Sequence, residues 1–254
     1  YTEKLEEMVR KRTRELEEAQ AKLIQSEKLA AMEKLAAGVA HEINNPAGVL
    51  LMKLKFLLSI AGEEGLSNRA VSTLHITIEQ IERIGKIIEN LLSFSRPAEG
   101  IRIPVDVNQI LEAVSTLSGH TISTHGIDLN LDLENNLPPV MSDPTELEQV
   151  VIKLINNAVD AMPEGGRLTV GTSRDPNEKR EIVLQVKDTG IGISPQHLHN
   201  IFDPFFTTKQ VGEGTGLGLS ISYGIIEKLG GRIEADSHLG KGTNFVVRLP
   251  AQES

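Results

Sequence analysis

The chain has 254 residues, the length of one or two domains, and 39% of them are hydrophobic, enough for a core of ordinary size. Its formal charge of −9 at pH 7 argues against a nucleic-acid-binding surface, so we expect no nucleic-acid partner. The absence of cysteine excludes a disulfide framework, zinc-finger spacing and a catalytic thiol.

No segment has the composition of a membrane anchor. The longest apolar runs are interrupted by Lys53 and Lys55, far short of about 18 consecutive apolar residues, and no signal peptide is recognisable. We therefore expect no membrane contact within this fragment. Because the chain begins at Tyr1 inside a heptad-like pattern, we expect a piece of a longer protein. The absence of cysteine fits a reducing compartment, and we expect a cytoplasmic location. The sequence leaves open whether the full protein is membrane-anchored upstream.

The first 30 residues have the composition of a coiled coil. Glu, Lys, Arg, Ala and Leu dominate up to about residue 40, which favours a helix. Spacings of three and four join the positions of a seam with one irregular member, Arg12: Leu5, Val9, Arg12, Leu16, Ala19 and Leu23. We expect residues 1–30 to pair in parallel with a second copy. A single solvated helix is the alternative, although an unpartnered helix of this length would be marginally stable.

Residues 31–96 have the pattern of a helical hairpin. One helix runs to about Ser59, residues 61–65 form a turn, and a second helix spans about Asn68 to Ser95. The second helix carries a wide apolar stripe: Val71, Leu74, Ile78, Ile81, Ile84, Ile87, Ile88, Leu91 and Leu92. Two helices with stripes this wide cannot cover each other, whereas two copies would close a four-helix bundle. The sequence therefore predicts a homodimer through the hairpin and the coiled coil.

Residues 97–105 are expected to be a linker, and residues 106–254 an α/β sandwich domain. Its predicted helices span Val107–Leu117, Pro144–Met162 and Leu217–Leu229, with Asp143 capping the second. Its predicted strands are Ile127–Leu133, Arg167–Thr172, Glu181–Lys187, Arg232–Ala235 and Asn244–Leu249. This order predicts a mixed sheet with helices on one face. The fold class is thus multidomain: a dimeric helical bundle followed by an α+β domain.

A histidine with nucleophilic character lies in the first hairpin helix, in the run His41-Glu42-Ile43-Asn44-Asn45-Pro46. Helical periodicity of ~100° per residue places His41 opposite the apolar positions, with Asn45 one turn further along its face. A carboxylate that holds the Nδ1 proton, such as that of Glu42, leaves Nε2 free to attack. Taken alone, the pattern also fits an ordinary exposed helix histidine.

Two motifs of the second domain have the chemistry of nucleotide binding. Asp188-Thr189-Gly190-Ile191-Gly192-Ile193 places a carboxylate at the end of a strand, where it can accept a hydrogen bond from an exocyclic amino group. The glycines of residues 212–220 lie at the start of a helix, where free N–H groups attract phosphate. Taken alone, the first motif also fits a simple turn, and the second a flexible loop.

A loop and a helix of the same domain add further candidates. Three phenylalanines lie in residues 201–209, where they can latch a mobile lid, and Lys209 can meet phosphate charge. The alternative is that these aromatic rings only fill the core. Asn157 and Asp160 share one face of the helix 144–162, and an asparagine oxygen suits Mg²⁺ that is shared with nucleotide phosphates.

Together, five motifs in this order resemble the sensor histidine kinases of two-component systems: residues 41–46, 157–161, 188–192, 202–206 and 214–219. The resemblance covers essentially the whole chain. It implies a signalling coiled coil, a dimerisation and phosphotransfer hairpin, and an ATP-binding domain of the kind shared with gyrase, Hsp90 and MutL. It also implies two cofactors, ATP and Mg²⁺, and a response regulator receiver domain as partner.

The resemblance assigns roles to individual residues. It makes His41 the phosphoacceptor, Glu42 the base that polarises it, and Asn45 the residue that positions water when the kinase dephosphorylates its partner. Asn157 becomes the Mg²⁺ ligand, Asp188 the adenine contact, and residues 193–214 the ATP lid. The full set of expected nucleotide-site residues is Lys153, Asn157, Asp160, Asp188, Gly190, Gly192, Ile193, Thr208, Lys209, Gly214, Thr215, Gly216, Leu217, Gly218, Leu219 and Thr243.

One position departs from the family pattern. Four residues before Asn157, where these kinases usually carry asparagine and the related ATPases a glutamate base, the chain has Lys153. The missing carboxylate fits a protein that transfers phosphate to histidine and not to water. A lysine there can pair with phosphate or displace part of the metal shell, which leaves the magnesium geometry open.

The predicted function is ATP-dependent autophosphorylation of His41 and transfer of the phosphoryl group to an aspartate of a response regulator, with possible phosphatase activity toward it. Two rivals remain at this point. One is a nucleotide-binding ATPase or chaperone-like module with an inert His41. The other is a non-catalytic or regulatory dimeric scaffold that binds nucleotide, which only Lys153 supports.

Overall fold

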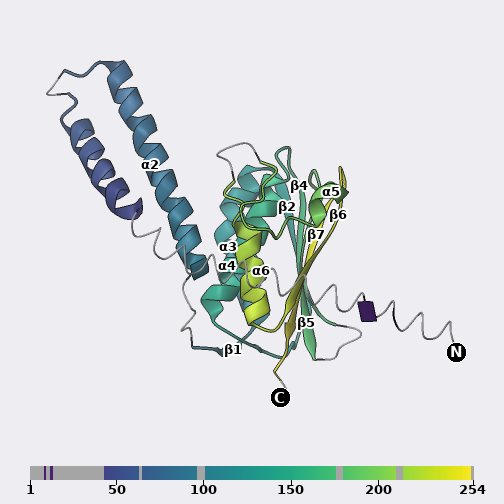
Figure 1. Cartoon of the computed structure of the whole chain (residues 1–254). Coiled ribbons are helices and arrows are strands. Elements are labelled where there is room, and N and C mark those ends of the chain that lie inside the picture. The colour runs from purple at the N-terminus through teal and green to yellow at the C-terminus, as the bar shows by residue number, and fades with distance from the viewer. Residues whose placement is uncertain are drawn as a thin grey trace. The chain divides into compact units, whose positions relative to one another are not determined.

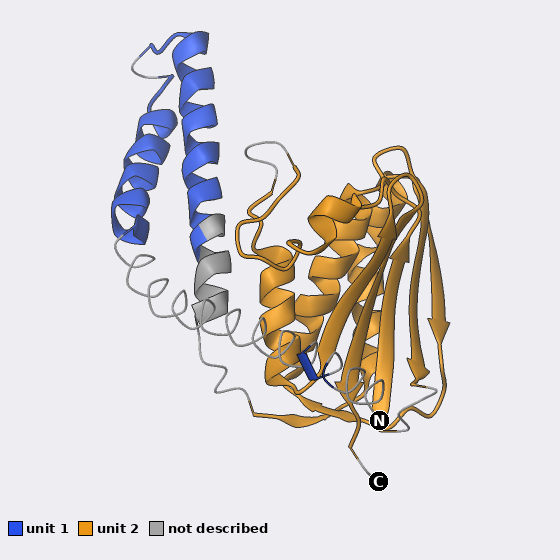
Figure 2. Ribbon diagram, turned by 45° about the vertical axis from the view of Figure 1, so that its right-hand side comes forward, with its two compact units in different colours: residues 1–97 blue, residues 98–254 orange. Residues whose placement is uncertain are grey.

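The structure, a computed structural model, describes residues 9, 12, 13, 43–62, 65–95, 101–175, 180–209 and 214–252. Of residues 86, 87 and 89–95 only the backbone is described. The chain divides into two compact units, Tyr1–Pro97 and Ala98–Ser254 (Figure 2). His41, Glu42 and the expected coiled coil, except for residues 9, 12 and 13, lie outside the described residues. No helix of the described part is long and apolar enough to span a bilayer.

The first unit contains the expected helical hairpin. A helix covers residues 43–59, a turn follows around Ala61, and α2 spans Asn68–Ser95 (Figure 1). The Ser67 hydroxyl accepts a hydrogen bond from the N–H of Ala70 at 3.3 Å and so caps the start of α2. Lys55 Nζ lies 2.8 Å from Glu82 Oε1 and links the two helices. Of the predicted stripe, Ile78, Ile81 and Ile88 are buried, whereas Ile84 is 43% exposed.

The second unit is built on a five-stranded mixed sheet with the order β2-β4-β5-β7-β6. The strands are β2 Ile127–Leu133, β4 Gly166–Arg174, β5 Glu181–Asp188, β6 Arg232–His238 and β7 Gly242–Pro250. β2 and β4 are parallel, and the other pairs are antiparallel. Strand alternation explains the core, because Phe245, Val247 and Leu249 of β7 point inward and are buried.

Three helices cover one face of this sheet, as predicted (Figure 1, Figure 2). They are α3 Val107–Thr124, α4 Pro144–Asp160 and α6 Gly218–Lys228. The predicted cap of α4 is confirmed, since Asp143 Oδ1 accepts a hydrogen bond from the N–H of Thr145 at 2.9 Å and Pro144 opens the helix. Leu154 and Ile155 of α4 are fully buried and form the centre of the core.

Several elements differ from the sequence prediction. α3 continues seven residues past Leu117, because Ile122 is buried and anchors the last turns despite their serine, glycine and threonine content. Two short strands, β1 Ile103–Val105 and β3 Val140–Ser142, pair antiparallel, so β1 occupies the end of the expected linker 97–105. A one-turn helix, α5 Pro195–Leu198, was not predicted.

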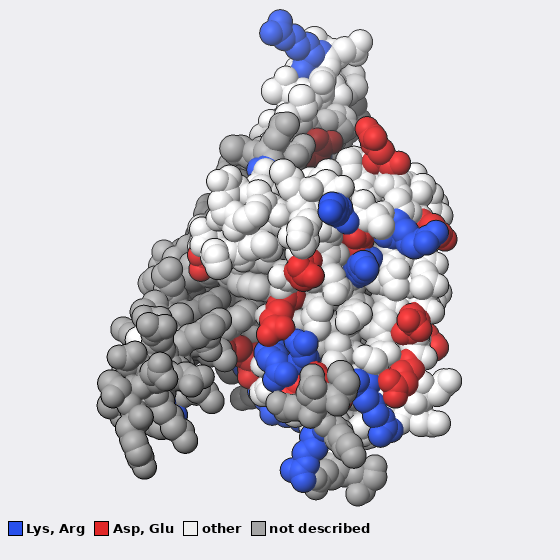
Figure 3. Space-filling view, turned by 90° about the vertical axis from the view of Figure 1, so that its right-hand side faces the viewer, with Lys and Arg blue, Asp and Glu red and all other residues white. Residues whose placement is uncertain are grey.

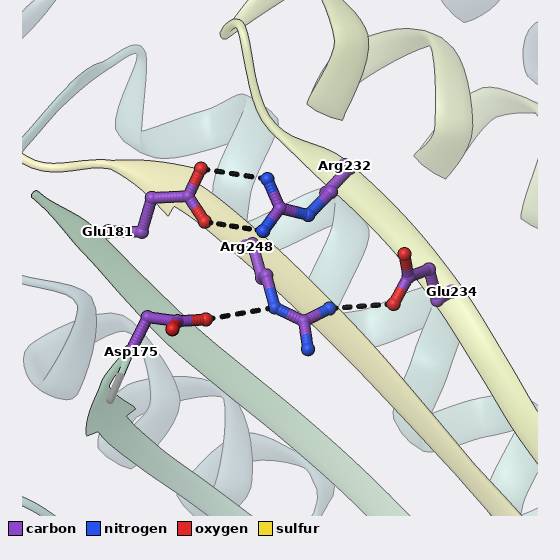
Figure 4. A network of polar contacts seen from close by, with 5 residues as sticks. All are labelled: Asp175, Glu181, Arg232, Glu234 and Arg248. Atoms are coloured by element: carbon purple, nitrogen blue, oxygen red, sulfur yellow. Dashed lines mark hydrogen bonds and ion pairs between the residues drawn. The ribbon is translucent and has the colours of Figure 1, made fainter. Parts of the chain in front are cut away.

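The face of the sheet that the helices leave open is polar, with acidic and basic side chains interspersed (Figure 3). At its β6 edge, Arg248 Nε lies 3.1 Å from Asp175 Oδ2, and Arg248 Nη1 lies 2.7 Å from Glu234 Oε2 (Figure 4). Arg232 pairs with Glu181 at 2.9 Å beside them. These contacts pair the charges of the five residues with one another.

Candidate functional site

The site is centred on Asp188, the last residue of β5. Its side chain is only 2% exposed. Asp188 Oδ1 accepts hydrogen bonds from the backbone N–H of Gly190 at 2.8 Å and of Thr243 at 3.1 Å. Burial raises the pKa of this carboxyl above its ordinary value, although the bonds from Gly190 and Thr243 oppose that shift. The two donors fix one oxygen in place, so the carboxylate is oriented before any ligand binds.

Glycines make this arrangement sterically possible. Gly242 has a φ of +93°, and a Cβ there would lie 2.0 Å from the carbonyl oxygen of Asp188. A Cβ on Gly190 would lie 2.3 Å from the carbonyl oxygen of Ala161, at the C-terminal end of α4. The N–H of Ile191 also donates to Ala161 O at 2.9 Å. The loop after β5 is therefore fixed against the C-terminal end of α4.

Ser237 of β6 belongs to the site, and the sequence analysis missed it. Its hydroxyl oxygen accepts a hydrogen bond from the N–H of Ile193 at 2.8 Å, and it lies 2.9 Å from Thr243 Oγ1. It also donates to the carbonyl oxygen of Gly242 at 2.9 Å. Ser237 thus joins Ile193 and Thr243, two predicted site residues. Strand alternation after the buried Ile233 is the sequence signal that places Ser237 on the inner face.

The polar face of α4 borders the site. Asn157 is half-buried, and its side-chain amide makes no hydrogen bond within the part of the chain that the structure describes. Asp160, one turn further on, pairs with Lys209 Nζ from the loop after α5. Lys153 is half-buried one turn before Asn157, and burial lowers its pKa. The structure brings Asp160 and Lys209 into contact, whereas among the described residues Lys153 makes no hydrogen bond or ion pair with another predicted residue.

The predicted lid, residues 193–214, includes α5 and most of the loop between α5 and α6. Phe202 packs against Tyr223 of α6 with ring centroids 5.6 Å apart, and Phe206 packs against His197 at 5.5 Å. Phe205, by contrast, is 54% exposed. Two of the three phenylalanines therefore pack against neighbouring aromatic rings and anchor the loop. This agrees with the alternative that these rings fill the core. Thr208 is exposed, and residues 210–213 lie outside the described part.

The two described ends of this loop lie side by side. A Cβ on Gly214 would lie 2.9 Å from Thr207 Oγ1 and 3.2 Å from Lys209 Cδ. A Cβ on Gly216 would lie 2.3 Å from the backbone carbon of Phe205. The segments before residue 210 and after residue 213 therefore approach each other too closely for side chains at Gly214 and Gly216.

Helix α6 begins at Gly218 without a side-chain cap. Its first-turn N–H groups lack a side-chain acceptor, and a Cβ on Gly218 would meet no atom within 4 Å. Before it, Leu217 is buried and its N–H donates to Thr215 Oγ1 at 3.4 Å, while Leu219 is half-buried. An open helix N-terminus of this kind suits an anion. Gly192, on the far side of the site, lies against the carbonyl oxygen of His238.

Of the three residues predicted to act in phosphotransfer, His41, Glu42 and Asn45, only Asn45 lies in the described part of the chain. It is exposed on the helix of residues 43–59, in the first unit.

Two family models match the chain. The model of the "His Kinase A (phospho-acceptor) domain" matches residues 31–100, and that of the "Histidine kinase-, DNA gyrase B-, and HSP90-like ATPase" matches residues 142–253. Sensor kinase CckA of Brucella abortus is 37% identical over 94% of this chain, which spans only 26% of that protein.

Solved structures agree with these matches. The catalytic domain of histidine kinase ThkA is 32% identical with a TM-score of 0.53, covering 59% of this chain and 95% of that domain. ThkA in complex with the response regulator protein TrrA is 26% identical with a TM-score of 0.61. That match covers 90% of this chain and 64% of the ThkA chain.

Proposed function

Because the chain belongs to the histidine kinases of two-component systems, we propose that it binds ATP in its second unit and transfers the γ-phosphoryl group to His41. The observation that carries this proposal is the buried Asp188 carboxylate, held by two backbone N–H groups in a domain of the ATPase family. The same chain carries the phospho-acceptor domain. The similarity to histidine kinases favours this function over a non-catalytic scaffold and over an ATPase without a phosphoacceptor.

The nucleotide would lie between Asp188 and the N-terminus of α6. The free oxygen of the Asp188 carboxylate would accept a hydrogen bond from the exocyclic amino group of adenine, and Thr243 and Gly190 keep that carboxylate oriented. The uncapped first turn of α6 at Gly218 would receive phosphate oxygens. Lys209 now pairs with Asp160. When nucleotide binds and the lid closes, the Lys209 ammonium group would pair with a phosphate in place of the Asp160 carboxylate.

Asn157 is the residue that would hold Mg²⁺. Its amide oxygen is half-exposed and uses no partner among the described residues, and a neutral oxygen suits a hard cation whose other ligands are phosphate and water. The ion, when bound, supplies positive charge to the phosphates.

The chemical step is an in-line displacement. Nε2 of His41 forms a bond to the γ-phosphorus while the bond between that phosphorus and the bridging oxygen of ADP breaks. In this proposal the Glu42 carboxylate would accept a hydrogen bond from the Nδ1–H of His41 and so keep the lone pair on Nε2. Catalysis then consists mainly of positioning and charge neutralisation.

A second copy of this chain is the proposed partner of the hairpin. The described hairpin residues leave many large apolar side chains exposed: Ile43, Val49, Leu50, Met52, Phe56, Leu57, Leu66, Ile76 and Ile84. Burying such side chains stabilises an association by roughly 1.5–3 kcal/mol each when burial is complete. A four-helix bundle of two hairpins would bury those that lie opposite the His41 face, such as Ile43, Leu50 and Leu57.

A response regulator receiver domain is the proposed acceptor of the phosphoryl group, as the complex of ThkA with TrrA suggests. Helical spacing places Val49, Met52 and Phe56 on the face that Asn45 and His41 share. Met52 is 65% exposed and Phe56 62% exposed, so this face offers an apolar surface beside the phosphoacceptor. Asn45, also exposed, is the proposed water-positioning residue for dephosphorylation.

The proposed domain boundaries follow from these roles. Residues 1–30 would form the coiled coil and 31–96 the dimerisation and phosphotransfer domain. The linker would be shorter than the expected 97–105, because β1 at residues 103–105 pairs with β3 and so belongs to the ATP-binding domain. The proposed location is the cytoplasm, where ATP is available.

Incubation with γ-³²P-labelled ATP and Mg²⁺ tests the proposal. We expect a covalent label that is labile in acid and stable in alkali, and that disappears in His41→Gln. His75→Gln is the matched control, because His75 is an exposed histidine on α2 of the same hairpin. Steady phosphate release without a covalent label would instead support the ATPase reading.

A further inference from the structure

Helix α4 carries a polar stripe that the proposed function uses only in part. Glu146, Lys153, Asn157 and Asp160 follow one another at spacings of seven, four and three residues, which places them on one side of the helix. All four are half-buried or exposed, whereas Leu147, Val151 and Leu154 of the same helix are buried. The stripe therefore faces outward beside the core, with a single cation between its two carboxylates.

Both carboxylates of the stripe have other cations near them. Glu146, at the start of α4, lies within the electrostatic reach of Lys228 and Arg102. Asp160, at the end of α4, pairs with Lys209. Lys153 has no hydrogen bond or ion pair in the part of the chain that the structure describes. A half-buried ammonium group without a counter-ion is costly, and burial lowers its pKa accordingly.

Along α4, Asn157 lies nearer than Lys153 to the end of the helix that contacts the loop of Asp188. The loop of Asp188 is fixed to Ala161, at the C-terminal end of α4. A nucleotide whose base lies at Asp188 would extend its phosphates toward Asn157 and then toward Lys153, one turn further along the stripe. A helix turn is about 5.4 Å, close to the spacing between the first and third phosphorus atoms of a triphosphate. The phosphate farthest from the base is thus the one nearest Lys153.

We propose that Lys153 binds the terminal phosphate of ATP and makes the site selective for the triphosphate over the diphosphate. This inference rests on the proposed nucleotide site. The lysine supplies positive charge where a neutral amide would depend on the metal ion alone, so ATP binding in this chain keeps part of its strength without Mg²⁺. The phosphate in turn provides the anion that the Lys153 ammonium group lacks in the free protein.

The test is equilibrium binding of ATP and ADP by titration calorimetry, once with Mg²⁺ and once with EDTA. Lys153→Asn should weaken ATP binding roughly tenfold and ADP binding less than about twofold, as expected for one charge-assisted hydrogen bond. The loss of ATP affinity should be larger in EDTA. Lys153→Arg, which keeps the charge, should retain the preference for ATP. Lys187→Asn is the matched control, because Lys187 is an exposed lysine of β5.

The outcomes separate this inference from the proposed function. An equal loss for ATP and ADP in Lys153→Asn, or no loss for either, would overturn the role of Lys153 while leaving nucleotide binding intact. Loss of the ATP preference in Lys153→Arg would also overturn it, provided that thermal unfolding of the unliganded variant matches the native chain. A native chain that binds neither nucleotide would contradict the proposed function itself.

Discussion

Replacing Asp188 by asparagine should weaken the binding of adenine nucleotides without unfolding the domain. The asparagine oxygen can accept both hydrogen bonds that Asp188 Oδ1 now receives from Gly190 and Thr243. Its amide nitrogen would then occupy the position of the free carboxylate oxygen and face the adenine amino group, donor against donor. The side chain is 2% exposed, so water cannot easily rescue the contact.

The expected loss of binding free energy in Asp188→Asn is that of one hydrogen bond to a charged group. Losing it costs about 1.5–3 kcal/mol, a decrease in ADP affinity of about 10- to 150-fold. Titration calorimetry should show this decrease for ADP but not for IDP, whose carbonyl oxygen on C6 can accept a hydrogen bond from the new amide. The thermal unfolding midpoint should change little, since the neutral side chain avoids the burial of a charge. Asp236→Asn, on the exposed side of β6, is the control.

Unchanged ADP affinity in Asp188→Asn would refute this reasoning. An equal loss for ADP and IDP would also do so, because it would mean that the substitution disturbs the site as a whole.

Three further predictions follow from the same geometry. Gly242→Ala should lower the free energy of unfolding by about 2 kcal/mol or more, because Gly242 has a positive φ and its new Cβ would collide with the carbonyl oxygen of Asp188. Gly218→Ala should change that free energy by no more than about 1 kcal/mol, because a Cβ there meets no atom within 4 Å. Thermal unfolding of the two variants tests the difference. Because burial raises the pKa of Asp188, its carboxylate should become protonated, and ADP affinity should decrease, at a higher pH than if Asp188 had the pKa of an ordinary aspartate. Because its pKa is raised in the folded protein, protonation of Asp188 stabilises the folded state as the pH falls. A lower ADP affinity measured between pH 7 and 5 would therefore not result from unfolding caused by Asp188. Ile84→Asp should convert a dimer into a monomer in analytical ultracentrifugation, since a charge would replace an apolar side chain that is 43% exposed.

The sequence predicted best the features that depend on local patterns. β2 has the predicted bounds, Asp143 caps α4 as expected, and the mixed sheet with helices on one face is confirmed. These features follow from periodicity and capping, which involve residues close together in the chain.

Features that depend on distant partners were missed. β1 and β3 are three residues each, and they pair with one another across 34 intervening residues, Asp106 to Pro139. Ser237 joins Ile193 to Thr243 through contacts that span 44 and 6 residues, and a lone serine in a strand gives no sign of this. The pairing of Lys209 with Asp160 likewise spans 49 residues.

The most direct test of the account is to locate the phosphoryl group after reaction with ATP and Mg²⁺. Peptide mass spectrometry at neutral to alkaline pH should place it on His41, and Asp188→Asn should reduce the yield at subsaturating ATP. Adding a receiver domain should then remove the label from His41 and transfer it to an aspartate. Phosphorylation of another residue, or none in a chain that still binds ATP, would contradict the account.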